Sequence, residues 1–327
     1  MANERVSSKR MSLLADVAEM YFLEGNGQSD IALKVGVTRS MVSRMLTEAR
    51  LQGIVEIKVI RPVRSDPELE QAIKNKFGIE FVNVVSIEDS KPEKLLKFLG
   101  LAAAEVLKKQ LRANVAIGVS WGTAVSATVE AFQVMREPSI KIVQLVGAQG
   151  ARIVEYDGHM IVKQLAEKLG GEGYYINAPY LCQTPEIAQS LRETRGIKET
   201  IDMGKEVQVA LLGIGTTETE YSSFYLSGLL SEEEIDVIRK NGVVGDIASN
   251  YFKMDGTPYK DDFLGRIITI RIEDLKQIPV RIGIAGGSAK VNAIFGALNS
   301  KLINYLVTDS LTAKLIINLP PRITTDN

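Results

Sequence analysis

Hydrophobic positions in the first sixty residues recur with a helical period. Between Met11 and Glu24 the apolar residues fall on one stripe of a helix, and Gly25-Asn26-Gly27 interrupts the pattern. A second helix is predicted from Gln28, and a third follows Thr38, whose hydroxyl can cap its first turn. Gly36 lies between them, where a sharp turn favours a residue that accepts positive φ. Two short helices joined in this way predict a helix-turn-helix.

The third predicted helix has an apolar face and a polar face. Val42, Met45 and Leu46 share the inward face, so the polar side chains point outward. In this motif the second helix enters the major groove, where Arg reads guanine, and the helix before it contacts phosphates. A helical hairpin with a solvated face is the alternative, but the glycine turn combined with outward arginines favours DNA. The predicted DNA-binding residues are Gln28, Ser29, Thr38, Arg39, Ser40, Ser43 and Arg44.

The segment that follows predicts a wing and then a hinge. IVEIKVI (54–60) alternates like a strand and is compatible with a wing beside the reading helix. RPVRSDPELE (61–70) contains two prolines and mixed charge, and Asp66-Pro67 favours a helix starting at Glu68. The sequence therefore predicts a DNA-binding domain over 1–60 and a second domain over 61–327, which begins with the hinge.

Beyond the hinge, short apolar runs alternate with helical segments. The predicted strands are Phe81–Ile87, Val115–Val119, Ile140–Val146, Gly173–Ile176, Val207–Ile214, Ile267–Ile272, Val280–Ala285 and Tyr305–Val307. The predicted helices include Glu93–Leu111, Thr123–Met135, Met160–Leu169, Pro185–Thr194, Glu232–Asn241 and Ala289–Leu298. Buried strands interleaved with helices indicate an α/β fold with a mainly parallel sheet.

Small residues follow four of these strands. The four loops begin with Ser120-Trp121-Gly122-Thr123, Gly147-Ala148-Gln149-Gly150, Gly215-Thr216-Thr217 and Gly286-Gly287-Ser288. The ends of parallel strands lie on one edge of the sheet, where such folds bind ligands. A strand that turns through glycine into a helix can hold a phosphate with its backbone amides. Lys290 follows the last loop and can add positive charge. Asp246, in VVGDI, can either cap a helix or accept hydrogen bonds from a polyol.

Composition narrows the chemistry. Cys182 and His159 are the only cysteine and histidine in 327 residues, so we predict no intrachain disulfide and no zinc site of the usual ligands. A Ser-His triad would need His159 as its base. No apolar run is long enough to span a bilayer, and a reducing cytoplasm fits the chain. Residues 1–64 carry ten basic and seven acidic side chains, within a total net charge of −1. The excess of basic side chains in this segment favours an anionic binding partner.

Several motifs resemble the SorC family of bacterial transcriptional regulators, also called SorC/DeoR-type sugar-binding regulators. The similarity covers essentially the whole chain and appears in QSDIALKVGVTRSMVSRMLTEARLQGIVEIKV, IGVSWGTAVSA, VVGDIASNYF and VRIGIAGGSAKVNAIFGAL followed by LVTD. The family joins a helix-turn-helix to an effector domain that looks like sugar-phosphate isomerases in fold. Its members typically form tetramers, with the dimer as the minimum unit. They change their operator binding when a phosphorylated sugar binds.

The resemblance implies a role for each matching residue. Ser120, Gly122 and Thr123 would hold the phosphate, Gly286, Gly287 and Lys290 would support it, and Asp246 would meet sugar hydroxyls. Gly147 and Gln149 complete the predicted effector-binding set. The family often has two glycines where this chain has Gly147-Ala148, so the identity of the effector does not transfer.

The leading interpretation is a DNA-binding sensor of a phosphorylated sugar, with no catalytic residues and no cofactor. The alternative is a sugar-phosphate isomerase or deaminase-like enzyme with a fused DNA-binding head. Such an enzyme needs a positioned general base, and Asp246 is the only carboxylate that we can place near the strand-end loops. A nucleotide-binding protein is disfavoured, because the chain lacks G-x-x-x-x-G-K-[ST] and a G-x-G-x-x-G that follows a strand.

Overall fold

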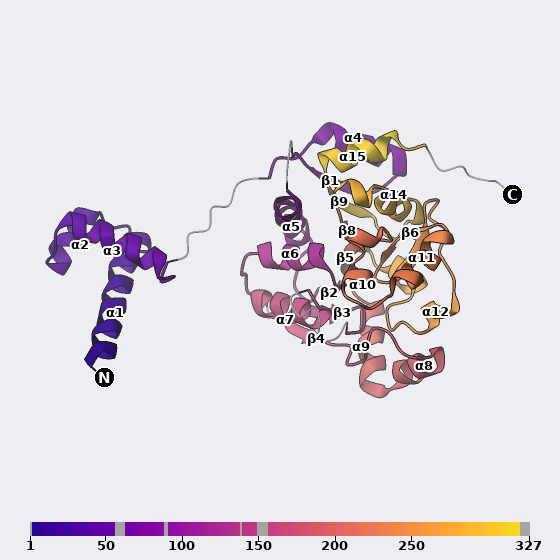
Figure 1. Ribbon diagram of the computed structural model, residues 1–327, viewed down its shortest axis with the longest axis horizontal. Coiled ribbons are helices and arrows are strands. Elements are labelled where there is room, and N and C mark those ends of the chain that lie inside the picture. Colours follow the sequence, from indigo (N-terminus) through magenta and orange to yellow (C-terminus); the bar gives the residue numbers. More distant parts are fainter. Residues whose placement is uncertain (1, 56–62, 88–90, 138, 149–155, 321–327) are drawn as a thin grey trace. The chain divides into compact units, whose positions relative to one another are not determined.

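A computed structural model describes residues 2–55, 63–87, 91–137, 139–148 and 156–320 (Figure 1). Contacts divide the chain into two compact units, Met1–Pro62 and Val63–Asn327. Each unit has its own hydrophobic core and is described by itself.

The N-terminal unit contains three helices, α1 (Ala2–Phe22), α2 (Gln28–Val35) and α3 (Arg39–Leu51). The tight turn between α2 and α3 is built as expected. Gly36 has φ 73°, and the side chain of Thr38 accepts a hydrogen bond from the Met41 amide. The helices enclose a small core that includes Leu14, Val17, Ile31, Ala32, Val42, Met45, Leu46 and Ala49. The predicted helix-turn-helix is therefore present.

Most of the predicted wing and the first residues of the predicted hinge lie outside the described residues. Ile54 and Val55 pack against the small core, but 56–60 lie outside the described residues. Residues 61 and 62 also lie outside them. The next helix, α4 (Pro67–Phe77), starts as its sequence predicts, because the carboxylate of Asp66 accepts a hydrogen bond from the Leu69 amide at 3.2 Å.

The second unit is built on a mainly parallel sheet. Its central path is β1-β9-β8-β5-β2-β3-β4, and every pairing along it is parallel. The strands of this path are β1 (Phe81–Val85), β2 (Ala116–Val119), β3 (Lys141–Gln144), β4 (Glu172–Tyr174), β5 (Val209–Thr216), β8 (Val280–Ile284) and β9 (Tyr305–Asp309). The expected fold class is confirmed.

Helices cover both faces of this sheet (Figure 1). One apolar core joins α5 (Pro92–Lys108), α6 (Thr123–Ala131) and α7 (Gly158–Leu169) to one face, through strand residues such as Ile117 and Leu211. The other core joins α4, α11 (Glu232–Lys240), α14 (Val291–Ser300) and α15 (Ser310–Asn318) to the opposite face, through the neighbouring residues Ala210 and Leu212. Successive strand residues point to opposite faces, and both faces are buried, which explains the continuous apolar runs. The remaining helices are α8 (Pro185–Glu193), α9 (Arg195–Lys205), α10 (Ser223–Leu226), α12 (Asp262–Gly265), α13 (Ile272–Gln277) and the short 3₁₀ helices η1 (Thr219–Tyr221) and η2 (Ser288–Lys290).

Two features of the strands differ from the sequence prediction. The predicted strand Ile267–Ile272 is wrong, because this segment forms only isolated bridges, Ile267 to Leu181 and Thr269 to Val146. Ile267, Ile268 and Ile270 are buried by packing and not within a strand ladder, and an apolar run in the sequence cannot distinguish these two kinds of burial. An antiparallel hairpin, β6 (Val243–Ile247) and β7 (Asn250–Lys253), was not predicted and pairs with the end of β5.

Candidate functional site

A cavity of about 550 Å³ opens at the edge of the sheet where the parallel strands end. Its lining comes from the segments that follow β2, β8 and β9, from the end of β5, from the hairpin strand β6 and from α5. Seven of the nine predicted effector-binding residues line it: Ser120, Gly122, Thr123, Asp246, Gly286, Gly287 and Lys290. Gly147 is not among the lining residues, and Gln149 lies outside the described residues.

The loop after β2 presents the start of a helix to the cavity. Gly122, with φ 120°, precedes α6, which begins at Thr123. The amides of a first helical turn have no partner within the helix, and the helix dipole makes that end positive. Ser120 is buried, and its hydroxyl accepts a hydrogen bond from the Gly213 amide at 3.2 Å. The loop is thus anchored to β5 and can offer an anion the first-turn amides of α6.

The second glycine loop is held by a carboxylate that sequence reasoning missed. The Gly287 amide donates to Oδ2 of Asp309 at 2.9 Å and to the hydroxyl of Thr312 at 2.7 Å, so this amide is already engaged. A side chain on Gly286 would collide with the same carboxylate. Asp309 also caps α15 through the Thr312 amide. An Asp between a strand and a helix is a capping signal in the sequence, which could have indicated this role.

Lys290 and Asp246 supply the opposite charges of the cavity. The Lys290 ammonium donates to the Ile214 carbonyl at 2.8 Å, and burial lowers its pKa to about 8, although Asp246 acts in the other direction. Asp246 is 6% exposed, and burial raises its pKa to about 6 against the opposing effects of the Ser249 amide and Lys290. Between these pKa values both groups are charged within one cavity.

Asp246 does not cap a helix, so that alternative is wrong. It lies within β6, and its Oδ2 accepts a hydrogen bond from the Ser249 amide at 3.0 Å in the turn that joins β6 to β7. An Asp side chain at the end of a strand can accept a hydrogen bond from a backbone amide in the following turn, and the local sequence does not distinguish this role from a helix cap. The role of Asp246 as an acceptor for polyol hydroxyls stays a prediction.

The cavity also has aromatic residues that were not predicted. Trp121 and Phe224 line it and pack edge to face, with ring centroids 5.1 Å apart. Behind them, Tyr180 stacks on Phe224 at 5.4 Å and Tyr251 lies 5.7 Å from it. This aromatic cluster fixes the wall next to Asp246. Its members are scattered from 121 to 251, so only the fold brings them together.

The predicted DNA-binding residues lie as expected on the N-terminal unit. Arg39, Ser40, Ser43 and Arg44 are exposed on α3, and Thr38 and Ser29 are exposed at the starts of helices; Gln28 is half-buried. Neither Arg39 nor Arg44 forms an ion pair within the described part of the chain. By contrast, Arg10 pairs with Glu48 at 2.6 Å and links α1 to α3. The two α3 arginines therefore remain available for an anionic partner.

Other candidate groups lie outside the cavity lining. His159 approaches Asp157 at 3.4 Å and stacks on Tyr175, and Asp157 raises its pKa. Cys182 is buried. No cluster of three or more His, Cys, Asp or Glu that could hold a metal ion occurs within the described ranges. Among the helices that the structure describes, none is long and apolar enough to cross a membrane.

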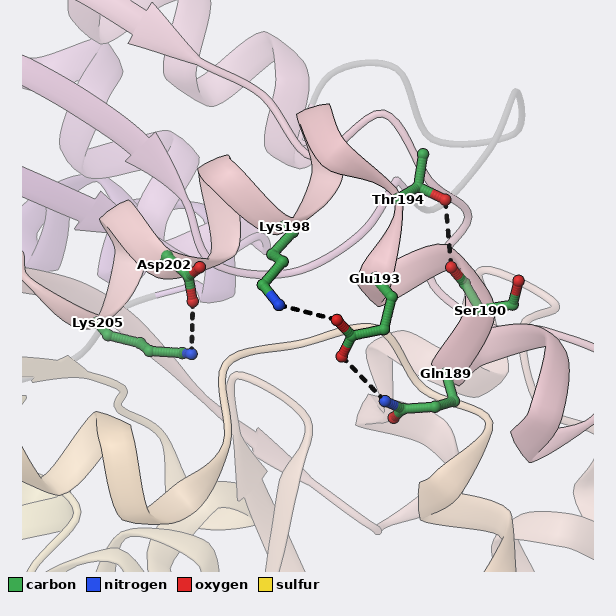
Figure 2. A network of polar contacts seen from close by, with 7 residues as sticks. All are labelled: Gln189, Ser190, Glu193, Thr194, Lys198, Asp202 and Lys205. Carbon is green, nitrogen blue, oxygen red and sulfur yellow. Dashed lines mark hydrogen bonds and ion pairs between the residues drawn. The ribbon is translucent and has the colours of Figure 1, made fainter.

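A polar network on α8 and α9 also lies away from the cavity lining (Figure 2). Lys198 pairs with Glu193 at 2.8 Å, and Lys205 pairs with Asp202 at 2.6 Å. The four side chains are between 40% and 57% exposed, and solvent-exposed pairs of this kind contribute little to stability. The network therefore carries no indication of binding chemistry.

Known proteins with similar sequences are transcriptional regulators. The protein family described as "Putative sugar-binding domain" matches residues 61–318. The deoxyribonucleoside regulator of Bacillus subtilis (strain 168) is 29% identical over 311 residues, which cover 95% of this chain and 98% of that protein. The sorbitol operon regulator of Klebsiella pneumoniae is 29% identical over 317 residues, which cover 95% and 99%.

Solved structures agree with these relatives. The crystal structure of the full-length sorbitol operon regulator SorC from Klebsiella pneumoniae matches with a TM-score of 0.74 at 28% identity, over 94% of this chain and 98% of that one. A DeoR family transcriptional regulator from Listeria monocytogenes matches with a TM-score of 0.70 at 29% identity, over 76% and 98%. The chain therefore belongs to the SorC family of transcriptional regulators with a sugar-binding domain.

Proposed function

We propose that this protein binds operator DNA through its N-terminal unit and that a phosphorylated sugar in the cavity controls this binding. The observation that carries the proposal is the combination of groups in the cavity. The start of α6, the ammonium of Lys290 and the carboxylate of Asp246 all line one space of about 550 Å³. A helix start and an ammonium suit a phosphate, and a buried carboxylate suits hydroxyl donors.

The coupling between sugar and DNA needs two conformations that bind the sugar unequally. Such coupling is typically worth about 1–3 kcal/mol. The names of the relatives, which include regulators of the sorbitol operon and of deoxyribonucleosides, support a sugar or sugar derivative as the signal. The predicted roles of Gly147 and Gln149 belong to the same proposal.

Calorimetry with a phosphorylated sugar and its dephosphorylated parent tests the proposal, using a panel of hexose and pentose phosphates. We expect at least one phosphorylated sugar to bind and its parent to bind poorly, because charge-assisted bonds to phosphate contribute about 1.5–3 kcal/mol each. Adding that sugar should also shift operator affinity in a gel assay. Equal binding of a sugar and its phosphate would overturn the phosphate site.

The relatives are named as regulators, which favours a protein without enzymatic activity. Asp246, a lining carboxylate with a pKa near 6, could serve as a general base in the enzyme alternative. We infer that the bound sugar phosphate is a signal and expect no turnover when the same mixtures are followed by product analysis. Formation of an isomer or release of ammonia would support the enzyme instead.

We further propose an even-numbered oligomer, a tetramer built from dimers, that acts in the cytoplasm on a pseudo-palindromic operator. One helix-turn-helix reads few base pairs, so two half-sites are needed for useful specificity. Sedimentation should show the tetramer with and without DNA. A monomer in both conditions would contradict this assembly.

A further inference from the structure

The lining of the cavity includes a polar and an apolar group of residues. We call the polar group, Lys290, Asp246, Ser120 and Thr123, the polar end. We call the apolar group the leucine wall. It consists of Ile87, Leu95, Leu96, Leu99 and Leu311.

The leucine wall continues directly from the second glycine loop. A Cβ on Gly286 would lie 3.0 Å from Cδ1 of Leu99, and a Cβ on Gly287 would lie 3.6 Å from Cδ2 of Leu95. Three residues after Gly287 the chain reaches Lys290 at the polar end. A ligand whose phosphate contacts Lys290 would therefore extend along this loop toward the leucines.

Part of the wall belongs to the hydrophobic core on one face of the sheet. Leu99 is 2% exposed and Ile87 is 8% exposed. Ile87 is held at both backbone groups, because its amide donates to the Ser310 hydroxyl at 3.2 Å and the same hydroxyl donates to its carbonyl at 3.1 Å. Leu311, at 52% exposed, forms the outer part of the wall.

A fully hydroxylated sugar phosphate does not match this wall. Hydroxyl groups buried against leucine lose their bonds to water and gain none, which is unfavourable. Two carboxylates line the cavity near these leucines. Glu93, on the same helix as three of them, is exposed, and Oδ2 of Asp309 already accepts hydrogen bonds from the Gly287 amide and the Thr312 hydroxyl. The apolar end thus offers burial of carbon surface rather than hydrogen bonds.

We propose, on the basis of the proposed function, that the effector is a phosphorylated sugar with an apolar substituent, such as an aryl or alkyl glycoside phosphate. The sugar phosphate occupies the polar end, and the substituent packs on the leucine wall. The cavity volume lies within the range that holds ligands larger than a simple sugar phosphate.

Calorimetry on the full-length protein tests this with matched ligands. The probes are the 6-phosphates of glucose, galactose and mannose, each as free sugar, methyl glycoside and phenyl glycoside in both anomeric forms. We expect a phenyl glycoside phosphate to bind roughly 10- to 100-fold more tightly than its methyl counterpart, because the ring buries apolar surface.

Leu311→Asn and Leu315→Asn form a matched pair of variants. Both leucines lie on α15 and are similarly exposed, at 52% and 46%, but only Leu311 lines the cavity. Because both side chains are exposed, neither variant is expected to unfold the protein. Leu311→Asn should remove most of the phenyl advantage and leave the methyl glycoside affinity nearly unchanged, whereas Leu315→Asn should keep the advantage.

The outcomes separate this inference from the proposed function. If binding depends on the phosphate but the phenyl group adds no affinity, the inference of an apolar substituent is overturned and the proposed sugar-phosphate sensor still holds. A phenyl gain that survives in Leu311→Asn also overturns it, because the ring would then lie elsewhere. Phenyl glycosides that bind equally with and without phosphate would support the wall but contradict the phosphate site.

Discussion

The carboxylate of Asp246 lies against the backbone of Gly215, its register partner across the antiparallel pair β5 and β6. A Cβ at position 215 would overlap Oδ1 of Asp246. Gly215 therefore makes room for the only carboxylate that lines the polar end of the cavity from the hairpin.

Gly215→Ala should displace the Asp246 carboxylate and weaken effector binding by roughly tenfold or more, because the carboxylate loses its position toward sugar hydroxyls. Calorimetry measures the affinity. Gly196→Ala is the matched control, since a Cβ there has open space. A double-mutant cycle on stability adds a second readout: Gly215→Ala should cost less in an Asp246→Ala background, where the overlap is gone. Additive costs would show that the two residues do not compete for space.

Lys290→Ala should weaken binding of the phosphorylated effector by roughly tenfold to a hundredfold, because the phosphate loses a charged donor. DNA affinity without effector should stay near wild type. Lys314→Ala on the exposed face of α15 serves as the control, since it removes a lysine outside the cavity lining. Unchanged effector affinity in Lys290→Ala would place the phosphate elsewhere.

Effector affinity should fall as the pH rises through about 8, because burial lowers the pKa of Lys290 in the free protein to about 8. Above this pH the side chain is a neutral amine and must take up a proton to pair with the phosphate, which is already a dianion there because its second pKa is about 6. Lys290→Arg stays charged and should lose this pH dependence. Titration calorimetry between pH 7 and pH 9.5 compares the two proteins. Parallel profiles would show that Lys290 does not contact the phosphate.

Asp246→Asn should change how stability depends on pH. The pKa of Asp246 is raised from 3.8 to about 6, so the folded protein holds a proton that the unfolded chain releases. The contribution of this group to the free energy of unfolding is then greatest below pH 3.8, and it declines by up to about 3 kcal/mol as the pH rises to 6. In Asp246→Asn this decline should disappear, and urea unfolding at pH 4, 5, 6 and 7 measures it. An identical decline in both proteins would assign it to other groups.

Ala248→Gly should stabilise the protein by about 0.5–1 kcal/mol, because Ala248 and Ser249 both adopt positive φ in the turn between β6 and β7. Glycine adopts this conformation without the steric cost, although it increases the conformational entropy of the unfolded chain, which offsets part of the gain. Ala131→Gly at the end of α6 should instead destabilise by about 0.5–1 kcal/mol. Thermal unfolding of both variants gives the comparison. A loss of stability in Ala248→Gly would mean that the turn carries no relievable strain.

Arg44→Ala should weaken specific operator binding by about 1–3 kcal/mol if the guanidinium reads a base, and Arg39→Ala should show a similar or smaller loss. Footprinting on the operator measures both. Arg195→Ala, a 93% exposed arginine side chain of the second unit, is the control. Wild-type protection in both α3 variants would contradict the proposed reading face.

The sequence determined the parts of this protein whose physics is local. The helix-turn-helix follows from the apolar spacing of α3, the left-handed Gly36 and the cap at Thr38. The parallel sheet follows from apolar runs alternating with helices, and the glycine loops at the ends of β2 and β8 mark the edge that holds the cavity. In each case one short segment carries enough information, because turns, caps and burial patterns depend on near neighbours.

The tertiary structure decided what depends on residues far apart in the chain. The hairpin β6–β7 places Asp246 against Gly215, and no local pattern distinguishes that carboxylate from a helix cap. Asp309 engages the Gly287 amide across 22 residues, which leaves the first turn of α6 as the better anion site. The leucine wall likewise joins α5, α15 and the segment after β1, because the sheet order sets β1 beside β9. Shape and electrostatics of the site arise from this long-range packing, which a reading of neighbouring residues cannot supply.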